Sequence, residues 1–193
     1  GSEGDEATGV SAARKADIEA LRLRRQQKQS ARERDMERCL VPLLRLIEDT
    51  NTTALKNEAT SALLSLSLNP ANANAFVLTG ALRVLFDLCS DRDPGVRANV
   101  LKILSALTES TLTHRVLVQQ GCVRAIVPHA RLKNSDEARF ATGTILALCA
   151  LEQNRDEMLA EPALVPTLLS LLAPAKQLSP STPTSSSKRR GRA

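Results

Sequence analysis

Six side chains in this sequence are of the types that most often bind metals or act as nucleophiles and bases: four cysteines and two histidines. The cysteines are 50, 33 and 27 residues apart and form no Cys-x-x-Cys pair: Cys39, Cys89, Cys122 and Cys149. Metal sites and redox-active dithiols use closely spaced pairs, whereas each of these thiols lies within or at the start of an apolar segment. We therefore predict reduced structural thiols and no metal site.

Neither histidine belongs to a recognisable catalytic motif. His114 begins a short predicted helix beside Arg115, and His129 is predicted on the polar side of its helix, so we expect both at the surface. The sequence contains no His-Glu-x-x-His motif, no arguable triad and no glycine-rich loop after a strand. We predict that the chain is not an enzyme and uses no cofactor.

The elements that would position these residues repeat at a fixed interval of 41 residues. Similar apolar segments occupy residues 39–50, 80–91, 121–132 and 162–173. Each of the first three is followed by a second apolar segment (58–67, 99–108 and 140–149) and then by a shorter one (72–79, 113–120 and 154–161). A fixed period of roughly 20–50 residues is typical of stacked repeat proteins, in which each unit buries its apolar face against its neighbours.

The second segment of each unit is predicted to be a helix, because its apolar residues return at offsets of three, four and seven. Four columns keep the interval without an insertion: Ala59/Val100/Ala141, Ala62/Ile103/Thr144, Leu63/Leu104/Ile145 and Leu66/Leu107/Leu148. The sequence therefore predicts a unit of three helices in about forty residues, and no strands.

The pattern resembles the armadillo repeat, and the likeness covers roughly residues 31–173. It is carried by Gly-Ala-Leu at 80–82, Gly-Cys-Val at 121–123 and Ala-x-x-Ala-Leu-x-x-Leu at 59–66. The resemblance implies an all-α fold, a right-handed α-solenoid of armadillo repeats. Independently of the family, Gly80 and Gly121 lie where one helix turns sharply into the next, and glycine accepts the positive φ that such a junction often needs.

The composition divides the chain into four parts. We expect residues 1–10 to be a disordered tag or linker, 11–38 a long basic helix, 39–173 the repeat array and 174–193 a disordered tail rich in Ser, Thr and Pro. The array divides into units 39–79, 80–120 and 121–161 and a partial unit, 162–173.

Two features of this organisation leave alternatives open. Helix 11–38 is either a solvated charged helix whose residues 31–38 cover the first unit, in register with the third helices, or a basic helix that binds an acidic partner or continues from a preceding domain. The last unit lacks its second helix, so either the solenoid is longer than this chain or the unit is an atypical terminal cap.

The formal net charge of +5 is distributed unevenly. Residues 1–10 contribute −3, 11–38 contribute +4, 176–193 contribute +5, and the array from 39 to 175 carries −1. A folded nucleic-acid binder usually gathers its cations on one face of the domain, so we do not expect nucleic acid as the partner. No apolar run approaches a membrane span and no signal peptide precedes the array, so we expect a cytoplasmic protein, with the nucleus as the alternative.

In armadillo proteins the second helix of each unit lines a concave groove that holds extended peptides or partner helices, and the resemblance implies the same here. The groove columns would be Asn57/Ala98/Arg139, Ser61/Lys102/Gly143 and Ser65/Ala106/Ala147. Nuclear-import adaptors carry Trp in the middle column and Asn in the last, and both are missing here. Small side chains leave room for a bulky partner, and Lys102 and Arg139 favour acidic groups; alternatively these positions are merely solvent-facing.

We predict a non-catalytic scaffold or adaptor that binds another protein, as a peptide or a helical segment, and no small-molecule substrate. The alternative is a chaperone cofactor, because residues 80–107 look like the armadillo unit of nucleotide-exchange factors for seventy-kilodalton heat-shock chaperones. A nuclear-transport adaptor is disfavoured by the missing Trp and Asn residues. The end of the tail is either a localisation signal or a solubilising segment: Lys188, Arg189, Arg190 and Arg192.

Overall fold

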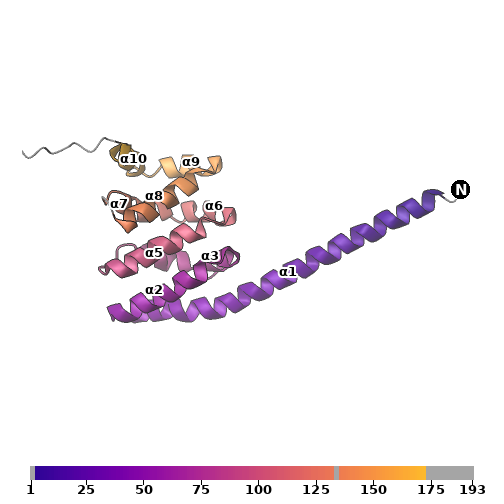
Figure 1. Ribbon diagram of the computed structural model, residues 1–193, viewed down its shortest axis with the longest axis horizontal. Helices are drawn as coiled ribbons and strands as arrows, with labels where there is room; N and C mark the ends of the chain where they lie inside the picture. Colours follow the sequence, from indigo (N-terminus) through magenta and orange to yellow (C-terminus); the bar gives the residue numbers. More distant parts are fainter. Residues whose placement is uncertain (1–2, 133–134, 173–193) are drawn as a thin grey trace, which may run out of the picture.

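All regular structure in the described part of the chain is helical. The computed structural model describes residues 3–132 and 135–172. Its α-helices are α1 (Glu3–Asp49), α2 (Thr53–Ser67), α3 (Ala73–Leu78), α4 (Ala81–Leu88), α5 (Pro94–Leu107), α6 (Thr111–Gln119), α7 (Cys122–Ala130), α8 (Asp136–Cys149), α9 (Glu152–Leu159) and α10 (Leu164–Leu172), with one 3-10 helix, η1 (Pro70–Asn72). The short helices form a stack, and α1 leaves it as one long rod (Figure 1).

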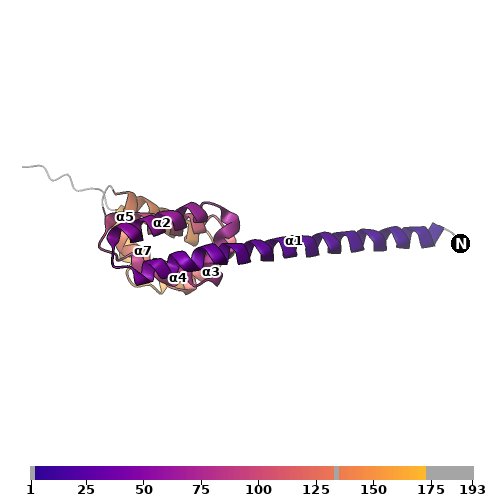
Figure 2. The same cartoon turned by 90° about the horizontal axis from the view of Figure 1, so that it is seen from below.

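The stack has three columns of equivalent helices. The longer helices α2, α5 and α8 pack on one another, as do α3, α6 and α9, and α4, α7 and α10 continue the column begun by the end of α1. Seen from below in Figure 2, α2 and α5 lie on one side of the stack and α4 and α7 on the other. The predicted unit of three helices is confirmed, and the chain is an all-α repeat protein.

Apolar columns run through the stack and form one continuous core. Leu63, Leu104 and Ile145 occupy the same position in successive units and are all fully buried. Burying each such side chain contributes about 1.5–3 kcal/mol. Ala62 and Leu66 are only half-buried in the first unit, whereas Ile103 and Leu107 at the same positions in the second unit are fully covered.

The junction glycines adopt the backbone conformation that their positions predict. Gly80 has φ 74° and Gly121 has φ 93°, both in the left-handed region. The first unit has Cys39 at the corresponding position, and there the helix continues without a turn. For this reason α1 is a single helix through residue 49, where we predicted a boundary at 38/39.

The N-terminal end of α1 also differs from the prediction. We expected residues 1–10 to be a disordered linker, but α1 begins at Glu3.

Residues 31–38 of α1 take the place of a first-layer third helix, as their register predicts. Glu33 of α1 accepts a 2.7 Å hydrogen bond from the side-chain nitrogen of Asn74, which lies 41 residues later on α3. Met36 packs against the buried core. The exposed apolar residues Ile18, Leu21 and Leu23 lie farther out on the projecting part.

A side chain near the start of each third helix caps the carbonyl end of the preceding long helix. The bonds are Asn72 Nδ2 to the carbonyl of Leu66 (2.8 Å), Thr113 Oγ1 to that of Leu107 (2.6 Å) and Asn154 Nδ2 to that of Leu148 (3.0 Å). Carbonyls in the last turn of a helix have no partner within the helix, so these bonds satisfy groups that burial would otherwise leave unpaired. This interaction was not predicted, although the three donors follow the 41-residue step in the sequence.

The prediction that His114 lies at the surface is wrong, because this side chain extends the same capping. His114 is 4% exposed, and its Nε2 donates a 2.6 Å bond to the carbonyl of Thr108. In the next unit Arg155 Nε donates to the carbonyl of Cys149 at 3.2 Å. A polar residue at this position therefore points back at a helix end, not outward.

All four cysteines are free thiols in differing surroundings. Cys39 is exposed, Cys149 is half-buried, and Cys89 and Cys122 are buried. Burial raises the pKa of Cys89 to about 12 and also raises that of Cys122. These two neutral thiols therefore pack as small apolar side chains.

No helix in the described residues combines the length and the apolar character that crossing a bilayer would need.

Two glycine substitutions test how the backbone conformation shapes the stack. An alanine Cβ would meet no atom within 4 Å at either Gly80 or Gly143, so the two sites differ in φ and not in available space. We expect Gly80→Ala to lower the free energy of unfolding by about 1–2 kcal/mol, since a left-handed conformation is unfavourable for alanine. Gly143→Ala, inside α8, should raise it by about 0.5–1 kcal/mol. Urea denaturation of both variants measures the two shifts, and shifts of the same sign would contradict the account.

Candidate functional site

The residues expected to line a groove lie on α2, α5 and α8, which pack side by side (Figure 1). We call the solvent-facing side of these three helices the α2–α5–α8 face. Five of the nine predicted residues are exposed on it: Asn57, Ser61, Ser65, Arg139 and Gly143. Three are half-buried: Ala98, Lys102 and Ala147.

Ala106 does not face the solvent as predicted. Its side chain is 8% exposed. The reason is that α5 is the middle helix of the three and has α2 on one side and α8 on the other, so a short side chain on it is covered by its neighbours. Ala147, on α8, remains half-buried and accessible. A partner on this face therefore meets α5 chiefly through Lys102 and Ala98.

The two cations of the face both lie near the aromatic ring of Phe140. The guanidinium carbon of Arg139 lies 4.5 Å from the ring centroid of Phe140, and the Lys102 Nζ lies 5.7 Å from it. Each such contact contributes about 0.5–1 kcal/mol at an exposed site. Arg139 also pairs with Asp136 at 3.2 Å, but both side chains are about 70% exposed and the pair adds little stability. The sequence analysis named both cations but missed Phe140, whose position next to Arg139 was the available signal.

The other half of the face is polar, with amides and hydroxyls and one exposed carboxylate, Glu58, on α2. Asn99 Nδ2 on α5 donates to Oδ1 of Asn57 at 3.0 Å and to Oγ1 of Thr60 at 3.3 Å, both on α2. The side chains of Ser61 and Asn57 are exposed beside this contact. The face thus offers amides and hydroxyls between α2 and α5, and cations with an aromatic ring between α5 and α8.

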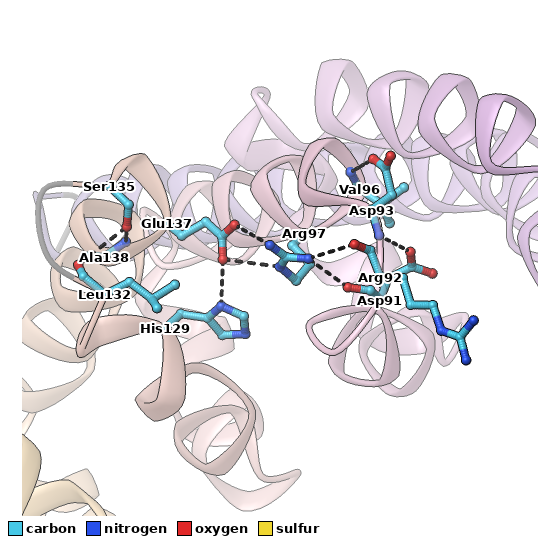
Figure 3. A network of polar contacts seen from close by, with 10 residues as sticks. All are labelled: Asp91, Arg92, Asp93, Val96, Arg97, His129, Leu132, Ser135, Glu137 and Ala138. Carbon is cyan, nitrogen blue, oxygen red and sulfur yellow. Dashed lines mark hydrogen bonds and ion pairs between the residues drawn. The ribbon is translucent and has the colours of Figure 1, made fainter.

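Next to this face, at the beginnings of α5 and α8, a second group of charges is fully engaged (Figure 3). Arg97 donates to both carboxylate oxygens of Glu137, at 3.0 and 3.3 Å, and to the carbonyls of Asp91 and Arg92, at 2.9 and 3.1 Å. His129 Nδ1 donates to Glu137 Oε2 at 2.8 Å. These bonds join the second unit to the third.

The prediction that His129 lies at the surface is therefore also wrong: the ring is 8% exposed and is held by Glu137. Burial alone would raise the pKa of Glu137, but the hydrogen bonds and positive charges of Arg97 and His129 outweigh it and hold that pKa below its usual range. A similar contact joins the first two units, where Lys56 Nζ lies 3.3 Å from Asp91 Oδ2.

The polar groups beside the face bond mainly within the chain. His129 binds Glu137 through Nδ1, and Arg97 donates four hydrogen bonds to Glu137 and two carbonyls. Within residues 3–132 and 135–172, no group of three or more His, Cys, Asp or Glu side chains could hold a metal ion. The basic residues of the tail, Lys188 to Arg192, lie outside the described residues.

Solved structures with a similar fold include designed and engineered proteins. One is a designed armadillo repeat protein in complex with the peptide (KR)4, at 19% identity and a TM-score of 0.63, with 72% of this chain and 58% of that chain covered. A second is a computationally designed armadillo repeat protein for modular peptide recognition, at 20% identity and a TM-score of 0.63, covering 70% and 58%. An engineered protein follows at 18% identity and a TM-score of 0.61, covering 74% and 57%.

This likeness shows that the chain has an armadillo-repeat fold. The chain spans less than two thirds of the length of these structures. No protein-family model matches the sequence, and no curated protein matches it either.

The network around Arg97 makes stability depend on pH. Because the folded-state pKa of Glu137 is lowered, its stabilisation is complete above its ordinary value of 4.5 and is lost as the pH falls through the folded-state value. We expect Glu137→Gln to cost about 2 kcal/mol at pH 7, where it leaves Arg97 without its carboxylate, and progressively less as the pH falls below about 4.

Urea denaturation between pH 7 and pH 3 measures this difference. Glu157→Gln, which removes an exposed carboxylate on α9, is the matched control and should change stability little at any pH. A Glu137→Gln cost that stays constant across the range would contradict the assignment.

Proposed function

We propose that the chain is a non-catalytic binding scaffold that holds an extended peptide or a helical segment of another protein on the α2–α5–α8 face. The observation that carries this proposal is the contrast between the two sides of these helices. Their inner sides are committed to the continuous core, while their outer sides present a run of small or polar residues: Asn57, Ser61, Ser65, Gly143 and Ala147. Small side chains on α2 and α8, on either side of α5, allow a partner to approach closely.

The size of the face suits an extended segment. A fully extended 12-residue peptide spans about 40 Å, and packed helices lie about 8–10 Å apart. Such a peptide therefore crosses all three helices. The peptide complex and the peptide-recognition design among the similar structures support a peptide as the class of partner.

The chemistry of the face separates this proposal from nuclear-import adaptors. Those proteins hold lysine-rich peptides with Trp and Asn, and the corresponding positions here hold Ser61, Lys102 and Gly143, then Ser65, Ala106 and Ala147. A lysine at the centre of the face repels a lysine-rich peptide. We therefore propose an acidic partner, met in the cytoplasm, with the nucleus as the alternative compartment.

A second candidate function rests on the likeness of residues 80–107 to the armadillo unit of chaperone nucleotide-exchange factors. Its test is direct: release of a labelled nucleotide from a seventy-kilodalton heat-shock chaperone would be timed with and without this protein. Faster release would favour the exchange factor, and an unchanged rate would remove it.

Selection of random peptides tests the scaffold proposal. Twelve-residue peptides displayed on phage would be selected on the chain, and their affinities compared on Ser61→Trp, which places a bulky ring in the middle of the face. Gln119→Trp adds the same ring at an exposed site on α6 and is the matched control. We expect at least a tenfold loss of affinity on Ser61→Trp and less than twofold on Gln119→Trp, with both variants equally helical. Equal affinities on the two variants, or no enriched peptides, would overturn the proposal.

A further inference from the structure

We propose that Lys102, Arg139, Phe140 and Gly143 form one subsite on the α2–α5–α8 face, and that it binds a carboxylate side chain of an acidic segment. This inference rests on the proposed function, because it names what one part of the same face would recognise.

The first step is that the two cations of the subsite are less engaged than the others nearby, since Lys102 has no ion pair within the described residues and Arg139 has only an exposed one. Lys56 is paired with Asp91, and Arg97 is saturated by Glu137 and two carbonyls. Among the described residues, Lys102 has no carboxylate within ion-pair distance, and its ammonium group lies over the ring of Phe140. A half-buried ammonium group in this position still has its three hydrogen-bond donors free.

The second step is that Phe140 fixes where the charges lie. The guanidinium of Arg139, on the same helix, and the ammonium of Lys102, on the neighbouring helix, both lie against this one ring, at 4.5 and 5.7 Å from its centroid. Long basic side chains normally lose much conformational entropy when they bind an anion. Contact with the ring restricts both side chains beforehand, so each binds an anion at a smaller entropic cost.

The net charge selects among anions. Arg139 shares its charge with Asp136, at 3.2 Å, so the subsite carries a net charge of +1 and not +2. A carboxylate, with one negative charge, neutralises it. A phosphate monoester carries about −1.5 to −2 at neutral pH and would leave negative charge uncompensated beside Asp136. The subsite therefore fits glutamate or aspartate better than a phosphorylated residue.

The position of Gly143 inside α8 is a further, independent observation that supports the subsite. A glycine inside a helix weakens it relative to alanine, and no atom of the chain within 4 Å explains its presence, since a Cβ there would point into open space. Gly143 lies one turn after Arg139 and Phe140, on the same side of α8. A position without a side chain beside two cations allows the main chain of a partner to lie close to α8, with its carboxylate between Lys102 and Arg139.

The rest of the face predicts where the acidic residue falls in the bound segment. Between α2 and α5 the face has the exposed side chains of Asn57 and Ser61 and the half-buried Asn99, which suit peptide N–H and C=O groups. Glu58, at the position of α2 equivalent to Asn99, is exposed and repels a second carboxylate. The acidic residue therefore occupies the part of the segment that crosses from α5 to α8, and the part over α2 is not acidic.

Fluorescein-labelled octapeptides test the subsite by anisotropy at low salt. The probe alternates Glu and Ser, and the comparison peptides alternate Gln and Ser, phosphoserine and Gly, and Lys and Arg. We expect the Glu-Ser peptide to bind at least tenfold more tightly than the Gln-Ser and Lys-Arg peptides, and to weaken as salt is raised. Lys102→Met with Arg139→Gln should reduce its affinity at least tenfold. Arg83→Gln with Arg115→Gln, which removes two exposed positive charges from α4 and α6, should change it less than twofold.

Each contrary result would overturn a different part of the proposal. Equal losses of affinity in the two double variants would show that the net charge of the chain attracts the peptide and that no subsite binds it. Tighter binding of the phosphoserine peptide than of the Glu-Ser peptide would overturn the assignment to a carboxylate. The Glu-Ser peptide could bind no better than the Gln-Ser peptide while the selected peptides still lose affinity on Ser61→Trp. That result would overturn the proposed subsite but leave the proposed binding scaffold intact.

A second variant addresses the close approach at Gly143 without touching a charge. Gly143→Leu should raise the melting temperature, because leucine is a better helix former and meets no clash, and should weaken the Glu-Ser peptide at least tenfold. Unchanged affinity in this stable variant would contradict close approach of the partner to α8.

Discussion

The structure depends on burying apolar side chains that return every 41 residues and that no single unit can cover by itself. Leu63, Leu104 and Ile145 belong to one buried cluster, and the helices that carry them pack on their neighbours: α2 on α1 and α5, α5 on α2 and α8, and α8 on α5, α7 and α9. Because the layers must stack to remove these residues from water, the three long helices are forced side by side with their outer faces aligned. The α2–α5–α8 face is thus a consequence of core burial, and its side chains remain outside the core.

Polar residues serve two distinct purposes in this stack, and their partners distinguish them. Asn72, Thr113 and Asn154 cap helix ends, and Arg97 with Glu137 and His129 joins two units; in each group the hydrogen-bonding capacity is used within the chain. Lys102 and Arg139 differ, since one rests on an aromatic ring without a carboxylate in the described part of the chain and the other has only an exposed, weak ion pair. Residues of the same type therefore stabilise the fold in one place and remain available to a partner in another.

The 41-residue periodicity predicted the features that repeat. It did not predict features that depend on contacts with neighbouring helices. The three-helix unit and the positive φ of Gly80 and Gly121 follow from spacing and residue type alone. The burial of His114, His129 and Ala106 does not, because it is set by a helix end, a carboxylate eight residues later and two flanking helices. The continuation of α1 through residue 49 could have been predicted from Cys39, because later units have glycine at this position. The binding partner could not have been predicted from the sequence, since an armadillo-repeat fold is compatible with many unrelated functions.

The central claim is that the outward sides of α2, α5 and α8 are the working surface of this protein. Amide hydrogen exchange of the whole chain, followed with and without a saturating peptide selected on it, tests the claim most directly, because it reports every helix at once. The account predicts slower exchange in α2, α5 and α8 and unchanged exchange in α3, α6 and α9. Protection confined to α1, or to α3, α6 and α9, would contradict it.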